Sequence, residues 1–261
     1  MATVFDRDLA GLGNLLLLHV VPLFNLPLGK RPTLVGCSLL VELGGIRYFV
    51  SARHVIDWIS APGGLHYYID RGKLHRLVGT VVHTVPTQET GMRDAFDVAV
   101  VRLEQDALLP SGENWKLPLE IEAIRARDSR RSKKQYLVVG FPKSRSNANP
   151  HTRRLKSEPS SFRIISAELA DYDHLGLSDA THIVLNLDID RMHFPDGTVR
   201  QIADPHGMSG SPLWLLFDED GDNDPHVTPV VGIVIEYHKD RKLLVATDIG
   251  IALALIEQSG S

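Results

Sequence analysis

The amino-acid sequence predicts an all-β fold, built as a barrel or a sandwich. Short apolar runs alternate with Gly, Pro, Asn and Asp turn signals along most of the chain. Sustained helical periodicity is rare. The 261 residues are 43% apolar, which is enough to form a full hydrophobic core. The first two observations favour many short strands and few helices, and the third allows these strands to enclose a core.

The first cluster of predicted strands lies in the N-terminal half. Gly44-Gly45 separates two apolar runs, and paired glycines suit the tight turn of a hairpin. A short helix is expected over His54–Ile59. The strands predicted in this half are Leu15–Phe24, Thr33–Leu43, Ile46–Ser51, Leu74–Val85 and Phe96–Leu103.

The second cluster follows the polar stretch Arg125–Lys134, which we interpret as a solvated linker. A C-terminal helix is expected over about residues 249–258 (Ile249–Gln258). The strands predicted in this half are Gln135–Phe141, Phe162–Leu169, His182–Ile189, Ser211–Phe217, Val227–Tyr237 and Lys242–Thr247. The two clusters, about residues 1–125 and about residues 135–247, are each large enough for one barrel within a single domain of residues 1–261.

Charge and cysteine content exclude several classes of protein. With 28 basic and 32 acidic side chains the net charge is −4, so no nucleic-acid partner is expected. Cys37 is the only cysteine, which excludes an intramolecular disulfide and a cysteine-based zinc site. The apolar stretch Leu15–Phe24 is shorter than the ~20 residues of a membrane-spanning helix. Acidic residues precede it, which argues against a secretory signal, so we expect no membrane partner and a cytoplasmic location.

Twelve histidines raise the question of a metal centre. The sequence has no His-Glu-x-x-His motif, and pairs such as His66 and His75 are too far apart for one helical turn. The acidic run Asp218–Asp224 resembles a calcium loop. However, Asn223 and Pro229 stand where that loop needs a glycine and a bidentate glutamate. We therefore predict no metal site and no cofactor.

A candidate nucleophile lies in the segment Gly207-Met208-Ser209-Gly210-Ser211-Pro212. A serine flanked by glycines can occupy a tight turn, where its hydroxyl is exposed and neighbouring N–H groups converge on one point. That is the geometry of a nucleophile beside an oxyanion hole. Gly-Ser-Pro clusters are also common in ordinary loops, so the segment needs partners elsewhere in the chain.

A serine nucleophile requires a base, and the base requires a carboxylate that orients it. His54 follows an apolar strand directly, and Asp97 stands at the entrance of the apolar run Val98–Leu103. A carboxylate there is drawn inward, which is unfavourable unless it finds a hydrogen-bonding partner. Asp94 is the competing carboxylate, but we prefer Asp97 because it directly precedes the apolar run.

Several segments, in this order, resemble the trypsin-like serine peptidases with the chymotrypsin fold. They are Gly36-Cys37-Ser38-Leu39-Leu40-Val41, Ser51-Ala52-Arg53-His54-Val55, Phe96-Asp97-Val98-Ala99-Val100-Val101-Arg102-Leu103, Val139-Gly140-Phe141-Pro142, Gly207-Met208-Ser209-Gly210-Ser211-Pro212 and Val231-Gly232-Ile233-Val234. The resemblance runs from about Thr33 to the C-terminal helix. It implies two antiparallel six-stranded β-barrels with the active site in the cleft between them.

The resemblance also implies roles for individual residues. Ser209 is the expected nucleophile, His54 the general base and then acid, and Asp97 the orienting carboxylate. The backbone N–H groups of Gly207 and Ser209 are expected to form the oxyanion hole. The implied activity is that of a serine endopeptidase, which cleaves peptide bonds through an acyl-enzyme intermediate.

Two departures from the family pattern narrow this expectation. Secreted zymogens have an aspartate just before the serine, and it pairs with a newly cut N-terminus. Met208 occupies that position here, so activation by N-terminal cleavage is not expected. With Cys37 as the only thiol, the chain resembles the disulfide-free bacterial branch of the family.

Substrate-binding residues follow from the same resemblance. Ala203 corresponds to the floor of the primary pocket, with Asp204 beside it, and His206 precedes the oxyanion glycine. Glu236 and Tyr237 fall where an extended substrate would pair. Ala203 at the floor favours small or apolar side chains, whereas a shift of one residue would favour basic ones.

The alternative function is a protein-binding module on the same fold, either catalytically silent or activated by a partner. The expected partners are a protein or peptide substrate and, in addition, a regulatory protein. An oxyanion loop in which the Gly207 N–H turns away from the cleft would favour this alternative.

Overall fold

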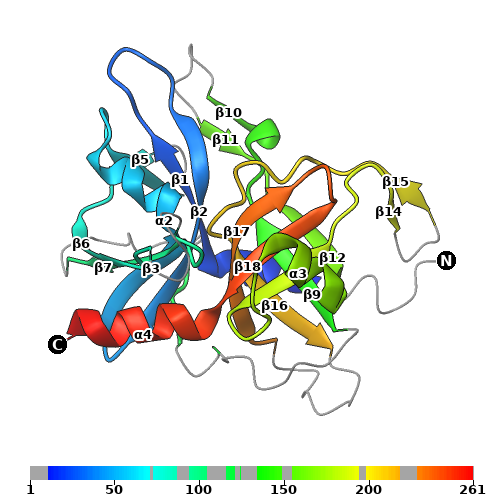
Figure 1. The fold of residues 1–261 in the computed structure, drawn as a ribbon. Coiled ribbons are helices and arrows are strands. Elements are labelled where there is room, and N and C mark those ends of the chain that lie inside the picture. Colours follow the sequence, from blue (N-terminus) through cyan, green and yellow to red (C-terminus); the bar gives the residue numbers. More distant parts are fainter. Residues whose placement is uncertain are drawn as a thin grey trace.

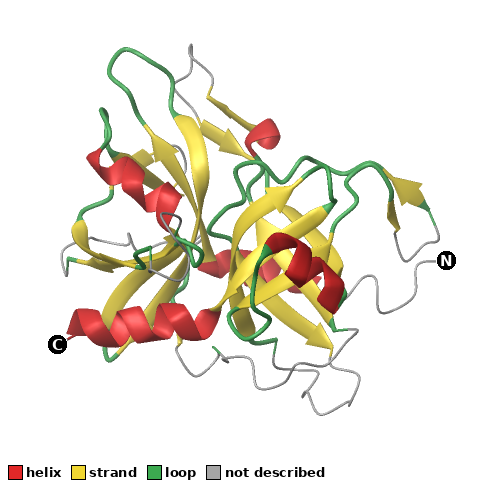
Figure 2. Cartoon of the chain, in the orientation of Figure 1, coloured by secondary structure: helices red, strands yellow, loops and turns green. Residues whose placement is uncertain are grey.

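A computed structural model describes residues 11–70, 73–86, 94–104, 116–120, 124, 134–148, 155–193, 198–217 and 228–260. The described residues form two β-structures that lie side by side, with a long helix across one face of the molecule (Figure 1). Strands make up most of the regular structure (Figure 2). The predicted all-β fold class with a C-terminal helix is confirmed.

The first β-structure is a curved sheet in the order β5-β4-β1-β2-β3-β7-β6, to which β8 adds by pairing with β2. Along the described strands this sheet stays open, whereas the sequence resemblance implied a closed six-stranded barrel. Its strands are β1 (Val20–Asn25), β2 (Thr33–Leu43), β3 (Ile46–Ala52), β4 (Leu65–Asp70), β5 (Lys73–Arg76), β6 (Gly79–His83), β7 (Val98–Leu103) and β8 (Leu119–Glu120).

The second β-structure is a closed six-stranded barrel in the order β12-β13-β18-β17-β16-β9, as expected for this half. Two separate two-stranded hairpins, β10–β11 and β14–β15, belong to the same half of the chain. The strands are β9 (Gln135–Gly140), β10 (Ser146–Ala148), β11 (Leu155–Ser157), β12 (Ser160–Ser166), β13 (His182–Asn186), β14 (Met192–His193), β15 (Val199–Arg200), β16 (Pro212–Phe217), β17 (Val230–His238) and β18 (Leu243–Asp248).

One hydrophobic core joins the two β-structures. It contains Leu39 and Val100 of the first sheet together with Trp214 and Ile233 of the barrel, all buried to within 1%. Helix α4 (Ile249–Gly260) packs against β6 and β7 of the first sheet and against β17 of the barrel. Burial of this shared apolar surface fixes the two halves relative to each other.

The start of the described chain differs from the prediction. Residues 11–16 are helical and η1 (Leu17–His19) continues them, so strand β1 begins only at Val20. The run Leu15–Leu18 is apolar enough for a strand, but leucine is unbranched at Cβ and favours helix. The first β-branched residue after this run, a type that favours extended structure, is Val20.

Other predicted elements are divided or shortened. The strand predicted over Leu74–Val85 is split into β5 and β6, because these strands lie at opposite edges of the sheet. The helix predicted after β3 is divided into α2 (Arg53–Ile56) and η2 (Asp57–Ser60). The strand predicted to reach Leu169 ends at Ser166, and α3 (Leu169–Leu175) follows.

Several sequence interpretations fall outside the described residues. The acidic run 218–224 lies there, and so does the predicted linker except for Lys134, which is buried. In the described ranges, no three metal-ligating side chains cluster. No helix there combines the length and apolarity needed to cross a bilayer.

Candidate active site

His54 and Asp97 meet because of the register between two strands. In the antiparallel pairing of β3 with β7, Ala52 lies opposite Val98. The residues just beyond this pair, Arg53 and Asp97, therefore face each other, and the Arg53 N–H donates to the Asp97 carbonyl oxygen over 2.7 Å. His54 is the next residue, in the first turn of α2.

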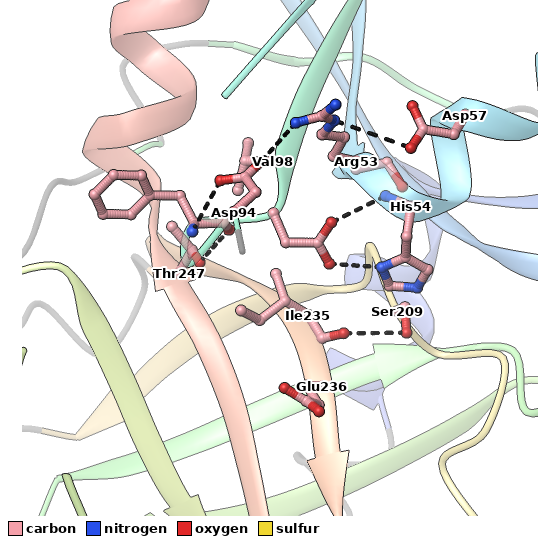
Figure 3. Close-up of polar contacts among 12 residues, drawn as sticks. Arg53, His54, Asp57, Asp94, Val98, Ser209, Ile235, Glu236 and Thr247 are labelled. Atoms are coloured by element: carbon pink, nitrogen blue, oxygen red, sulfur yellow. Dashed lines mark hydrogen bonds and ion pairs between the residues drawn. The ribbon is translucent and has the colours of Figure 1, made fainter. Parts of the chain in front are cut away.

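The Asp97 carboxylate binds His54 twice. Its Oδ2 accepts a hydrogen bond from the imidazole Nδ1 at 2.5 Å, and its Oδ1 accepts one from the His54 backbone N–H at 3.0 Å (Figure 3). The backbone of Asp97 has φ +47°, a left-handed conformation that aspartate tolerates better than most residues. With Nδ1 as donor, the opposite ring nitrogen, Nε2, is the one left to accept a proton.

Asp94 has different partners. Its Oδ2 accepts hydrogen bonds from Arg53 Nη1 at 3.2 Å and from the Thr84 hydroxyl at 2.7 Å. Its Oδ1 accepts the N–H of Phe96. Of the two candidate carboxylates, Asp97 is therefore the one that contacts the imidazole of His54.

Ser209 lies in a double turn between the two β-structures. The Met208 N–H donates to the Pro205 carbonyl at 2.8 Å, and the Ser211 N–H donates to the Met208 carbonyl at 2.9 Å. Gly210 has φ +86°, and a Cβ there would lie 2.0 Å from the Cys37 carbonyl oxygen. Only glycine fits this position without a shift of the backbone, which explains the small residue after the serine.

The Ser209 turn is anchored on both sides. The Cys37 N–H of β2 donates to the Ser209 carbonyl at 2.8 Å, and the Gly210 N–H donates to the Val234 carbonyl of β17 at 2.7 Å. Cys37 is fully buried beneath the turn, and its Sγ is 3.5 Å from the Gly207 carbonyl oxygen. Burial raises the pKa of this thiol to about 11.

The Ser209 hydroxyl lies beside the His54 ring but is directed elsewhere (Figure 3). It donates to the Ile235 carbonyl oxygen of β17 over 3.4 Å, a distance at the limit for a hydrogen bond. None of the hydrogen bonds found among the described residues joins the hydroxyl to His54. The two side chains line the same cleft.

In the backbone before Ser209, the carbonyl group of His206 is bound by the backbone at Lys143. The Lys143 N–H donates to the His206 carbonyl oxygen at 2.8 Å. Because C=O and N–H of a trans peptide point in opposite directions, the Gly207 N–H is directed away from Lys143. In the described part of the chain, the N–H groups of Gly207 and Ser209 donate to no backbone carbonyl.

Comparison with known proteins identifies the architecture. No protein-family model matches the chain, and no curated protein matches it by sequence. The structure is similar to that of neuropsin, a serine protease expressed in mouse brain, with TM-score 0.57 and 15% identity over 93% of this chain and 94% of that chain. It is also similar to human heparin binding protein, with TM-score 0.53 and 14% identity over 92% and 90% of the two chains. The chain has the chymotrypsin-like fold.

In this chymotrypsin-like fold, the candidate residues share one cleft of about 910 Å³. His54, Asp97 and Ser209 line it together with four further carboxylate or imidazole side chains, namely Asp57, Asp94, Glu236 and His238. Leu175 and Leu177, around the end of α3, supply an apolar wall.

The carboxylates of the cleft control the ionisation of His54. Burial alone would lower the pKa of this imidazole. The hydrogen bond and charge of Asp97, together with the charges of Asp57 and Glu236, outweigh burial and raise the pKa above its usual value. The imidazole is therefore a stronger base than a free histidine.

The predicted substrate-binding residues are mostly brought together. Asp204, His206, Glu236 and Tyr237 line a smaller cavity of about 280 Å³ next to Ser209. Ala203, which we expected at the pocket floor, is not among the described residues that line this cavity, whereas Asp204 is. The Asp204 carboxylate also accepts the His206 N–H at 2.9 Å.

Sequence reasoning missed the residues that support the site. Thr84 and Arg53 hold Asp94, while Lys143 holds the His206 carbonyl. The only available sequence signal was the position of Arg53 directly before His54. Lys143 lies far along the chain from His206, and nothing in the sequence around Thr84 marks it as a partner of Asp94.

Proposed function

We propose that the chain is a serine endopeptidase. In this mechanism Ser209 Oγ attacks the carbonyl carbon of a peptide bond while His54 Nε2 accepts the hydroxyl proton. Asp97 keeps the imidazole in the correct tautomer and stabilises it once it is charged. The observation that carries the proposal is the 2.5 Å hydrogen bond between His54 Nδ1 and Asp97 Oδ2, in the cleft that Ser209 also lines.

The later steps use the same groups. The N–H groups of Gly207 and Ser209 would stabilise the oxyanion of the tetrahedral intermediate. His54 then donates its proton to the leaving amine, which gives an acyl-enzyme at Ser209. Water, deprotonated by His54, hydrolyses this ester and regenerates the serine. The proposed substrates are proteins or peptides.

Attack requires the serine hydroxyl to leave the Ile235 carbonyl oxygen and turn towards His54. The present bond is long, at 3.4 Å, so it opposes this change only weakly. Catalytic hydrogen bonds commonly tighten only when substrate is bound.

Met208 is buried, and the proposed enzyme forms its site without an ion pair at the residue before the serine, as in the disulfide-free bacterial branch.

A binding module on the same fold is the second candidate. The direction of the Ser209 hydroxyl favours it, because in this arrangement the serine is not activated by His54. One similar structure is that of human heparin binding protein, whose name describes binding rather than catalysis. The two candidates differ in whether Ser209 reacts.

Covalent labelling with a fluorophosphonate probe tests the proposal. We expect one probe molecule per chain, located on Ser209 by peptide mass mapping, and no labelling of Ser209→Ala or His54→Ala. Ser161→Ala, at an exposed serine of β12, is the matched control and should label as the parent chain does. A folded parent chain that does not react would leave the binding module as the better description.

A further inference from the structure

The segment that carries Asp97 lies between the two β-structures. Residues 94–97 lead into β7 of the first sheet, yet they also contact the barrel. Asp97 itself has φ +47°, a left-handed conformation that is uncommon for residues other than glycine. The contacts that hold the segment come from both sides.

On the side of the first sheet, Thr84 organises the segment. Its hydroxyl donates to Asp94, and its oxygen accepts the Val98 N–H at 3.1 Å. Arg53 Nη1 donates both to Asp94 and to the Thr84 carbonyl oxygen, the latter at 2.8 Å. These bonds hold Asp94, at the start of the segment, and Val98, the residue that follows it.

On the barrel side, two residues bind the middle of the segment. His182 of β13 donates from Nε2 to the Ala95 carbonyl oxygen at 2.9 Å, and its ring stacks on Phe96 with centroids 5.8 Å apart. Thr247 of β18 donates from Oγ1 to the Phe96 carbonyl oxygen at 2.6 Å. Both side chains are almost completely buried, at 2% and 0% exposure.

The two donors lie side by side on the barrel. In the pairing of β13 with β18, His182 is directly opposite Thr247. Two adjacent strands therefore present two donors to two successive carbonyl groups, those of Ala95 and Phe96. Asp97 is the next residue, so any movement of these carbonyls changes its backbone angles.

We propose that His182 and Thr247 are positioning residues of the barrel that hold Asp97 of the first sheet against His54. The inference rests on the proposed function and extends it. The His54–Asp97 pair belongs to the first sheet, but its geometry depends on residues of the barrel. Loss of either donor deprives a part-buried carbonyl of its protein partner, so we expect the segment to relax. The Asp97 carboxylate then binds His54 less closely.

The ionisation of His54 reports this contact without any need for catalysis. Its charged neighbours are Asp97 before β7, Asp57 of η2, Glu236 of β17 and the adjacent Arg53 of α2. Of these, Asp97 contributes most to raising the pKa of His54. If Asp97 is held less closely, the effect of burial on the pKa of His54 outweighs the effect of Asp97. The pKa of His54 should therefore fall.

The test uses NMR titration of the His54 ring in full-length chain carrying Ser209→Ala. Thr247→Val removes the hydroxyl and nearly preserves the shape of the side chain, whereas Thr247→Ser keeps a hydroxyl at this position. We expect the pKa of His54 to fall in Thr247→Val and to recover in Thr247→Ser. Val184→Ala, at a buried residue of the same strand as His182, is the control for simple loss of stability. It should lower the melting temperature and leave the pKa unchanged.

Three outcomes overturn the inference. One is an unchanged pKa of His54 in folded Thr247→Val, another is an equal shift in Val184→Ala, and the third is no recovery in Thr247→Ser. If Thr247→Val does not fold, His182→Gln, which keeps a donor, and His182→Leu, which lacks one, provide the same comparison. Fluorophosphonate labelling of the chain with Ser209 intact is scored separately. A chain that shows the pKa shifts but never labels retains the positioning role and loses the proposed function.

Discussion

The backbone N–H of Lys143 donates to the carbonyl oxygen of His206 over 2.8 Å, and this bond determines which way the peptide before Gly207 faces. If that peptide were reversed, the carbonyl oxygen of His206 would be directed towards the cleft and the Gly207 N–H away from it. The carbonyl is instead bound to Lys143, outside the candidate oxyanion hole. This orientation of the loop is the one that the proposed peptidase needs, whereas the Ser209 hydroxyl points to the Ile235 carbonyl oxygen rather than to His54.

The first prediction concerns Gly207→Ala. Gly207 has φ +92°, and a Cβ there would lie 2.9 Å from the Lys143 nitrogen, so the peptide would have to move. Losing one oxyanion donor lowers kcat by about 10²–10³-fold. We expect a similar loss in the rate of fluorophosphonate labelling. Gly44→Ala shares the left-handed backbone, with open space around its Cβ, and should keep the parent rate.

The second prediction separates the two carboxylates near His54. Asp97→Asn keeps the shape of the side chain and tolerates the left-handed backbone, but it no longer fixes the Nδ1–H tautomer. We expect kcat with a peptide substrate to fall by about 10⁴-fold. Asp57→Asn removes an exposed carboxylate whose nearest Arg53 atom is 3.9 Å away, and it should change kcat only a few-fold. Equal losses in the two variants would contradict the assignment of Asp97.

The sequence could predict those features that depend on local pattern. Alternating apolar runs and turn residues predicted most strands, and the strand ends near His54 and Asp97 follow from the same pattern. The α3 helix was predictable in principle, because Glu168 and Asp171 form a capping box and Gly176 ends the helix at φ +65°. The edge positions of β5 and β6 were not predictable, because the pairing of distant strands in a sheet leaves no local signal in the sequence.

The supporting contacts of the site were beyond sequence reasoning. His182 is 87 residues from Ala95, and Thr247 is 151 residues from Phe96. In the sequence, His182 is one of twelve histidines and Thr247 is one residue of an apolar strand. The hydroxyl direction of Ser209 was equally unpredictable, because it depends on a rotamer rather than on a motif.

The third prediction concerns the pH dependence of the rate and the contribution of Glu236 to it. His54 must be neutral to accept the serine proton, and its pKa is raised above 6.5, so the rate should increase with pH around a midpoint above 6.5. Glu236→Gln removes one charge that raises this pKa, and the midpoint should move to lower pH. High salt should act in the same direction, because Glu236 is partly exposed and its field is screened. A midpoint that stays fixed in the variant would show that Glu236 does not act on His54.

The fourth prediction concerns the thiol of Cys37. Its side chain is fully buried, with a pKa of about 11, and its backbone N–H binds the Ser209 carbonyl. We expect the native chain to resist iodoacetamide at pH 8 and the denatured chain to react quickly, since only the exposed thiolate is reactive. The rate in native buffer then measures how often the Ser209 turn separates from β2. Gly210→Ala, whose Cβ would lie 2.0 Å from the Cys37 carbonyl oxygen, should raise this rate, while Gly44→Ala should not. Rapid alkylation of the native parent chain would mean that the turn is not held against the first sheet.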